Sequence, residues 1–87
     1  MSEVIVITGG SSGIGGAYVA LAAAKRLSVG NLDRNAPGEG APEQTYPQTD
    51  LTDADSIESS FQTVKIGSSI VGLVNNAGLS ISHSHFA

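Results

Sequence analysis

The stretch VIVITGGSSGIG at residues 4–15 decides the fold of this 87-residue chain. Its first four residues are an unbroken run of Val and Ile, which predicts a strand covered on both faces, as in a parallel sheet. Residues 8–16 contain five glycines, and this density predicts a tight turn. Residues 17–25 are rich in Ala and Leu and predict a helix. A strand, a tight turn and a helix therefore follow one another directly.

The apolar residues of this first helix predict which of its faces is buried. Lys25 and Arg26 stand where the C-terminus of a helix favours positive charge. We expect one apolar face, which packs on the sheet, to consist of Ile14, Tyr18 (or Ala17), Leu21 and Ala22.

The remainder of the chain predicts further strands and one further helix. We expect a second strand at residues 27–33, a loop at 35–43, a short third strand at 45–50, a helix starting at 52–55 and a fourth strand at 70–74. Gly30 and Asn31 interrupt the second of these strands. Pro47 cannot donate a hydrogen bond to a ladder, so the third strand belongs at an edge of the sheet.

This order of elements, β-α-β-loop-β-α-β, predicts the α/β class. Short connections and right-handed crossovers give a doubly wound parallel sheet, here a partial one with strand order 3-2-1-4. Residues 1–87 then form the N-terminal part of a single domain. In such sheets, ligands bind at the carboxyl ends of the strands, in the crevice where the winding direction reverses. The first and fourth strands flank that crevice.

Charge and composition exclude several classes of function. The formal net charge is −4 and the chain has only four Lys and Arg residues, too few for a nucleic-acid-binding surface. The absence of cysteine excludes disulfides and thiolate metal sites. No apolar run approaches the roughly 20 residues that span a bilayer, and no secretory signal is visible at the start, so we expect a cytoplasmic location. An anionic ligand would have to be held by backbone dipoles.

The glycine turn is typical of a dinucleotide-binding loop. Gly9 would let the chain turn sharply, Gly13 would admit a pyrophosphate close to the backbone, and Gly15 would allow the helix to pack tightly. Free N–H groups at the start of the helix would then bind phosphate without any lysine.

The glycine turn has three alternative interpretations. The pattern Gly9-x-Ser11-x-Gly13 has the form of a hydrolase nucleophile elbow, with Asp33 or Asp50 as acid and His83 or His85 as base. An elbow normally follows several strands, which counts against it on the first strand. A nucleotide-hydrolase phosphate loop fails because Gly16 stands where lysine is required. A plain glycine turn is the third alternative.

Two acidic positions support the dinucleotide interpretation. Asp33 lies 18 residues after Gly15, near the expected spacing of about 20, where a carboxylate can accept both ribose hydroxyls and repel a 2′-phosphate. NAD is therefore favoured over NADP, although the neighbouring Arg34 could tolerate a phosphate. Asp50 can accept from the adenine amino group while Leu51 covers the ring. The alternative interpretation is that Asp33 and Asp50 are only turn residues at the ends of their strands.

A second element lies across the crevice from the glycine turn. Asn75-Asn76-Ala77-Gly78 ends the fourth strand. Its small residues would let a ribose and nicotinamide pass, and an Asn side chain would tie neighbouring strands together. The alternative is again an ordinary turn.

Taken together, these motifs resemble the short-chain dehydrogenase/reductase family over essentially the whole chain. The resemblance rests on Thr8-Gly9-Gly10-Ser11-Ser12-Gly13-Ile14-Gly15, Asp33, Asp50-Leu51-Thr52-Asp53 and Asn75-Asn76-Ala77-Gly78. It implies a Rossmann fold and NAD(P)-dependent oxidation of alcohols or reduction of carbonyls, commonly in a homo-oligomer. By analogy, Ser12 and Ile14 would lie toward the pyrophosphate, Asp33 at the ribose, Asp50 and Leu51 at the adenine, and Asn76, Ala77 and Gly78 at the inner ribose.

The chain departs from the family in one important respect. The family's catalytic Ser, Tyr-x-x-x-Lys pair and helix Asn all follow its fourth strand, and this chain has none of them. Neither Tyr18 nor Tyr46 is followed by a lysine four residues later. We therefore expect the chain to be the N-terminal, cofactor-binding part of a longer enzyme. A non-catalytic NAD-binding or interaction module is the alternative.

Overall fold

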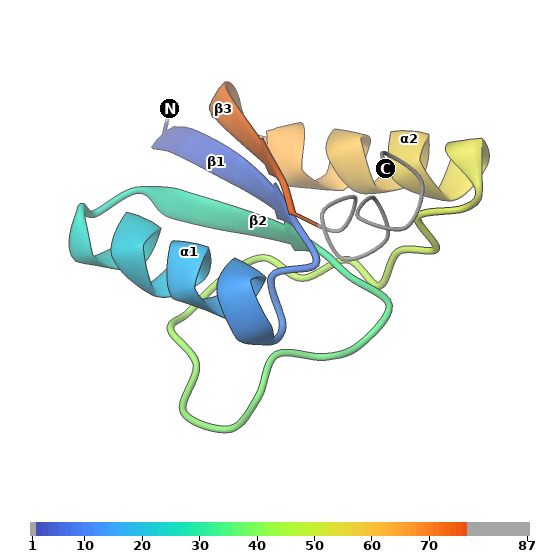
Figure 1. Ribbon diagram of the computed structural model, residues 1–87. Coiled ribbons are helices and arrows are strands. Elements are labelled where there is room, and N and C mark those ends of the chain that lie inside the picture. Colours follow the sequence, from blue (N-terminus) through green and yellow to red (C-terminus); the bar gives the residue numbers. More distant parts are fainter. Residues whose placement is uncertain (1, 77–87) are drawn as a thin grey trace, which may run out of the picture.

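A computed structural model describes residues 2–76 of the chain, and its elements alternate between strand and helix. In chain order they are β1 (Ser2–Thr8), α1 (Gly13–Ala24), β2 (Ser28–Leu32), α2 (Ala54–Lys65) and β3 (Ser68–Asn75). The three strands form one parallel sheet in the order β2-β1-β3 (Figure 1). The predicted α/β class and parallel sheet are confirmed.

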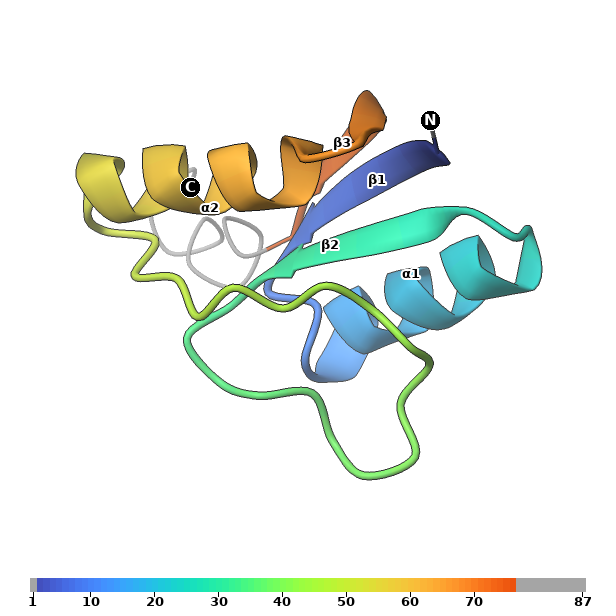
Figure 2. The same ribbon diagram turned by 180° about the vertical axis from the view of Figure 1, so that it is seen from behind.

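The two helices cover opposite faces of this sheet. Successive side chains of β1 point to opposite faces, so β1 contributes to the core under each helix. On one face, Ile7 packs with Val19 of α1 and Val29 of β2. On the other face, Val6 packs with Leu32 and with Val64 of α2. Since both faces of β1 are buried, its continuous Val/Ile run is explained. Figures 1 and 2 show the two helices on either side of the strands.

The predicted third strand is present only as a bridged segment, so the continuous sheet has three strands where four were expected, although the order of the segments agrees with the predicted 3-2-1-4. Residues 45–50 run parallel to β2 but form isolated bridges, Gly30 with Thr45 and Asp33 with Gln48. Between these bridges lies Pro47, which has no N–H to donate, so a continuous ladder cannot form there. The segment nevertheless occupies the expected outer position, beyond β2.

The buried face of α1 also differs from the prediction. Gly15, Val19 and Ala22 are turned inward, whereas three predicted core residues are exposed: Ile14 by 64%, Tyr18 by 40% and Leu21 by 54%. The reason is the close approach of Gly15 to the backbone of Gly9, which sets the rotation of the helix about its axis. The helix also begins earlier than predicted, at Gly13, with Ser12 as its N-cap residue.

The two residues that interrupt the second predicted strand both have structural reasons. A Cβ at Gly30 would lie 2.7 Å from Val64 Cγ1, so the glycine allows α2 to pack closely on β2. Asn31 is fully buried and bonded to the glycine turn. Among residues 2–76, neither helix has the length and apolar character that a membrane span requires.

Candidate functional site

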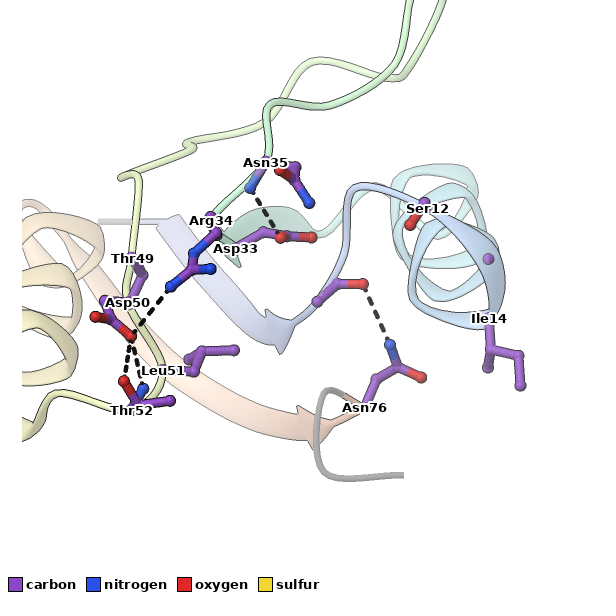
Figure 3. Close-up of a pocket in the computed structure, with 12 residues that line it drawn as sticks. Ser12, Ile14, Asp33, Arg34, Asn35, Thr49, Asp50, Leu51, Thr52 and Asn76 are labelled. Atoms are coloured by element: carbon purple, nitrogen blue, oxygen red, sulfur yellow. Dashed lines mark hydrogen bonds and ion pairs between the residues drawn. The ribbon is translucent and has the colours of Figure 1, made fainter. Parts of the chain in front are cut away.

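A pocket of about 520 Å³ lies at the carboxyl ends of the strands. The pocket opens beside the end of β1. From there the chain continues through α1 to β2 on one side of β1, whereas β3 lies on the other side of β1. Ligand sites in such sheets typically lie at this reversal of the winding direction. Figure 3 shows its lining side chains. The lining residues are Gly9, Ser12, Gly13, Ile14, Asp33, Arg34, Asn35, Thr49, Asp50, Leu51, Thr52 and Asn76.

The first half of the glycine turn is held by the end of β2. The N–H of Gly9 donates to the carbonyl oxygen of Leu32 (2.9 Å). The N–H of Gly10 donates to Asn31 Oδ1 (2.9 Å), and that of Ser11 donates to Asp33 Oδ2 (3.0 Å). Three consecutive amides of the turn are therefore occupied by the protein itself, and they fix the shape of the loop.

The second half of the turn is different. Within residues 2–76, the N–H groups of Ser12, Gly13 and Ile14 have no hydrogen-bond acceptor, and all three residues line the pocket. They stand at the N-terminus of α1, where the helix dipole places partial positive charge. Such a group of amides can hold an anion without help from a cationic side chain.

Two glycines of the turn have backbone conformations that favour glycine. Gly9 has φ of +68° and Gly13 has φ of +59°. A Cβ on Gly13 would meet no atom within 4 Å, so the space beside this backbone is open. A third glycine, Gly15, is required for a different reason: a Cβ there would collide with the carbonyl oxygen of Gly9 and lie 2.6 Å from Asn76 Nδ2.

Asn31 is a supporting residue that the sequence analysis did not assign to the site. Its side chain is completely buried. Besides accepting from Gly10, it donates through Nδ2 to Ser11 Oγ (3.0 Å) and to Gln44 Oε1 (2.8 Å), so it links the turn to the long connection after β2. The sequence indicates such a residue only by the presence of an asparagine in a predicted buried strand, where its side chain requires hydrogen-bond partners.

The hydroxyl of Ser11 is committed to this same network. Its Oγ donates to the carbonyl oxygen of Asn35 (2.5 Å) and accepts from Asn31. Within residues 2–76, no base contacts it, and the two histidines proposed for the hydrolase alternative, His83 and His85, lie outside the described residues. In the part of the chain that is described, Ser11 is a structural residue of the turn.

Asp33 lies at the end of β2 and points toward the start of α1 (Figure 3). Its Oδ2 accepts from the N–H of Ser11 and its Oδ1 accepts from the N–H of Asn35, each at 3.0 Å. A carboxylate has about four acceptor positions, so both oxygens keep the capacity to accept a further hydrogen bond from a ligand. The carboxylate is thus fixed in place without being saturated.

Arg34 turns away from Asp33 and toward Asp50. Its Nη2 lies 3.9 Å from Asp50 Oδ1, and because both side chains are substantially exposed this ion pair is weak. Asp50 is held mainly by Thr52, whose hydroxyl (2.6 Å) and N–H (2.9 Å) both donate to Oδ1. These bonds lower the pKa of Asp50 below its ordinary value of 3.8, and the charge of Arg34 adds to the effect.

Two asparagines at the end of β3 connect this strand to β1 and to the glycine turn. Thr8 Oγ1 donates to Asn75 Oδ1 (3.1 Å), and Asn76 Nδ2 donates to the carbonyl oxygen of Gly9 (3.2 Å). This is the strand-linking contact expected of the Asn-Asn pair. The predicted Ala77 and Gly78 lie outside the described residues.

The structure brings most of the predicted site residues to one pocket. Leu51 is one of the lining residues, whereas Ser11 and Gly15 do not line the pocket. Three further residues line the pocket without having been predicted as site residues: Asn35, Thr49 and Thr52. Each is within two residues of a predicted one, which is the only signal the sequence carries for them. In the described part of the chain, no cluster of three acidic or imidazole side chains is placed to hold a metal ion.

Comparison with known proteins assigns the chain to a family. No solved structure matches it. A model of the short chain dehydrogenase family matches residues 3–86, which is nearly the whole sequence. The chain therefore belongs to the short-chain dehydrogenase family.

Proposed function

We propose that this chain supplies the dinucleotide-binding half of an NAD-dependent oxidoreductase, which transfers hydride between the cofactor and a small alcohol or carbonyl substrate. The observation that carries the proposal is the juxtaposition of three amides, at Ser12, Gly13 and Ile14, that have no acceptor among residues 2–76, with the fixed carboxylate of Asp33 in one pocket. When bound, the nicotinamide would supply the hydride-transfer chemistry.

The pocket suits a dinucleotide in size and in the placement of its polar groups. Its volume of about 520 Å³ lies within the range of roughly 300–1,000 Å³ typical of cofactor sites. The diphosphate would bind at the start of α1, where Gly13 leaves open space beside the backbone. With a net charge of −4, the protein would rely on these backbone groups for anion binding.

The adenosine end would lie on the other side of the pocket. Asp33 would accept from the ribose hydroxyls, which is the usual function of an acid at the end of the second strand. Leu51 would cover the adenine ring, and Asp50 would accept from its amino group through the oxygen that Thr52 leaves free.

NAD is preferred over NADP in this proposal because of the arrangement of Asp33 and Arg34. The Asp33 carboxylate, fixed by two backbone amides, would meet a 2′-phosphate with like charge. Arg34 would offer only partial compensation, because its guanidinium is exposed and is directed toward Asp50.

Binding of NADH and NADPH to the 87-residue chain tests the proposal. The chain has no tryptophan, so the fluorescence of the reduced nicotinamide can be followed directly. We expect Asp33→Asn to raise the Kd for NADH by roughly tenfold or more, as for the loss of a charged hydrogen bond, and to reduce the preference over NADPH.

The matched control is Asp55→Asn. Asp55 lies in the first turn of α2 and does not line the pocket, so this variant makes the same change in net charge at a distance. It should bind NADH as the unmodified chain does. A folded chain that binds neither nucleotide, or equal effects of the two substitutions, would refute the proposal.

A further inference from the structure

The buried side-chain amide of Asn31 has only one orientation that satisfies its neighbours. Its Oδ1 must face the N–H of Gly10, because a backbone N–H can only donate. A Cβ on Gly10 would lie 2.6 Å from this oxygen, so the glycine leaves room for the contact. The two N–H groups of Asn31 Nδ2 then point to Ser11 Oγ (3.0 Å) and to Gln44 Oε1 (2.8 Å).

The orientation of Asn31 fixes the direction of the Ser11 hydroxyl. A hydroxyl has a single hydrogen to donate. Because Asn31 Nδ2 is a donor, Ser11 Oγ accepts from it, and the hydroxyl hydrogen is directed to the carbonyl oxygen of Asn35. The hydroxyl therefore holds the backbone of Asn35 against the glycine turn.

The two residues joined by this hydroxyl are the same two that hold the carboxylate of Asp33. The N–H of Ser11 donates to Asp33 Oδ2 and the N–H of Asn35 donates to Asp33 Oδ1 (Figure 3). Ser11, Asp33 and Asn35 thus close a ring of three hydrogen bonds. Asn31 donates into this ring from the buried side.

We propose that Asn31 is a positioning residue for nucleotide selectivity, and that it acts through the Ser11 hydroxyl on the Asp33 carboxylate. This role rests on the proposed function, in which Asp33 accepts from the ribose hydroxyls and repels a 2′-phosphate. A carboxylate held at both oxygens stays in place for the hydroxyls and does not turn away from a phosphate. Neither Asn31 nor Ser11 lines the pocket, so their effect does not come from contact with the nucleotide.

The ratio of the Kd for NADPH to the Kd for NADH tests this role. A smaller folded fraction would raise both constants by the same factor, so the ratio does not report on stability. Ser11→Ala removes the hydroxyl but keeps the N–H that binds Asp33. We expect it to lower the ratio roughly threefold to tenfold, as for the loss of one neutral hydrogen bond. Ser11→Thr retains a hydroxyl and should keep the ratio of the unmodified chain.

A double variant tests whether Asn31 acts through this hydroxyl. Asn31→Ala should lower the ratio, and its addition to Ser11→Ala should lower the ratio no further. Where Asn31→Ala does not fold, Gln44→Leu makes the same test, because it removes the other acceptor of the Asn31 amide. The matched control is Ser59→Ala, at an exposed serine of α2 that does not line the pocket, and it should leave the ratio unchanged.

Three results would overturn the role of Asn31: an unchanged ratio in Ser11→Ala, a lowered ratio in Ser11→Thr, or a further fall in the double variant. The proposed function would survive each of them if Asp33→Asn still weakens NADH binding. A folded unmodified chain that binds neither nucleotide would instead overturn the proposed function and the role of Asn31 together.

Discussion

At Gly15 an added methyl group would collide with the glycine turn, whereas at Gly16 the same atom would have room. A Cβ at Gly15 would meet the carbonyl oxygen of Gly9 and the side-chain amide of Asn76, which are hydrogen-bonded to each other. At Gly16 the nearest such atom, the carbonyl oxygen of Gly10, lies 3.8 Å away. We therefore predict that Gly15→Ala lowers the free energy of unfolding by about 1–3 kcal/mol.

Substitution of the neighbouring Gly16 should change the free energy of unfolding in the opposite direction. Gly16→Ala adds a good helix former without a collision, and we expect it to raise the free energy of unfolding by roughly 0.5–1 kcal/mol. Urea denaturation of both variants measures the difference. Equal effects of the two would show that α1 does not approach the turn as described.

The residues of the site differ in how far their positions could be predicted. Gly9, Gly13 and Asp33 belong to a motif whose spacing indicates their placement. Asn31 could not be assigned in this way, because its partners, Gly10 and Gln44, are set by the path of the loop and not by local sequence. An asparagine within a buried strand indicates that its side chain makes hydrogen bonds, but the sequence does not indicate which groups are its partners.

The bridged segment and α2 are joined by a buried pair of hydroxyls. Thr49 Oγ1 and Ser60 Oγ lie 2.6 Å apart, and both residues are almost completely buried. Thr49 Oγ1 also donates to the carbonyl oxygen of Pro47 (2.6 Å). Thr49→Val would leave Ser60 buried without this partner, and we predict a loss of about 1–3 kcal/mol in unfolding free energy.

A double-mutant cycle separates this contact from other effects. Ser60→Ala should cost less than Thr49→Val, because Thr49 keeps its bond to Pro47. The double variant should be less destabilised than the sum of the single ones, since the orphaned hydroxyl has been removed. Additive losses in urea denaturation would contradict the coupling.

The errors at the scale of elements have identifiable causes. The helix that contains Tyr18 and Leu21 is apolar almost all round, so periodicity did not distinguish its faces. The close contact at Gly15 decided the rotation instead. In the bridged segment, Pro47 was expected only to place the strand at the edge of the sheet. Because it lacks an N–H, it also prevents a continuous ladder, and the segment forms only isolated bridges.

At the scale of the whole molecule, the sequence predicted the parallel sheet and the position of the pocket. Alternation of strand and helix with right-handed crossovers determines which strands are neighbours, and this places β1 and β3 beside the crevice. The lining from the long connection, residues 33–52, could not be predicted in detail. Its path depends on hydrogen bonds from β2 and α2 that no local pattern specifies.

In the proposed function, an anionic diphosphate binds at the amides of Ser12, Gly13 and Ile14, which open α1 and have no acceptor within residues 2–76. The most direct measurement is the shift of backbone amide resonances in two-dimensional NMR as NAD is added to the chain. Gly67 is the internal control, because it has φ of +70° and open surroundings like Gly13 but lies outside the pocket. We predict the largest shifts at Gly13 and Ile14 and none at Gly67. Unmoved Gly13 and Ile14 resonances at saturating NAD would contradict the account.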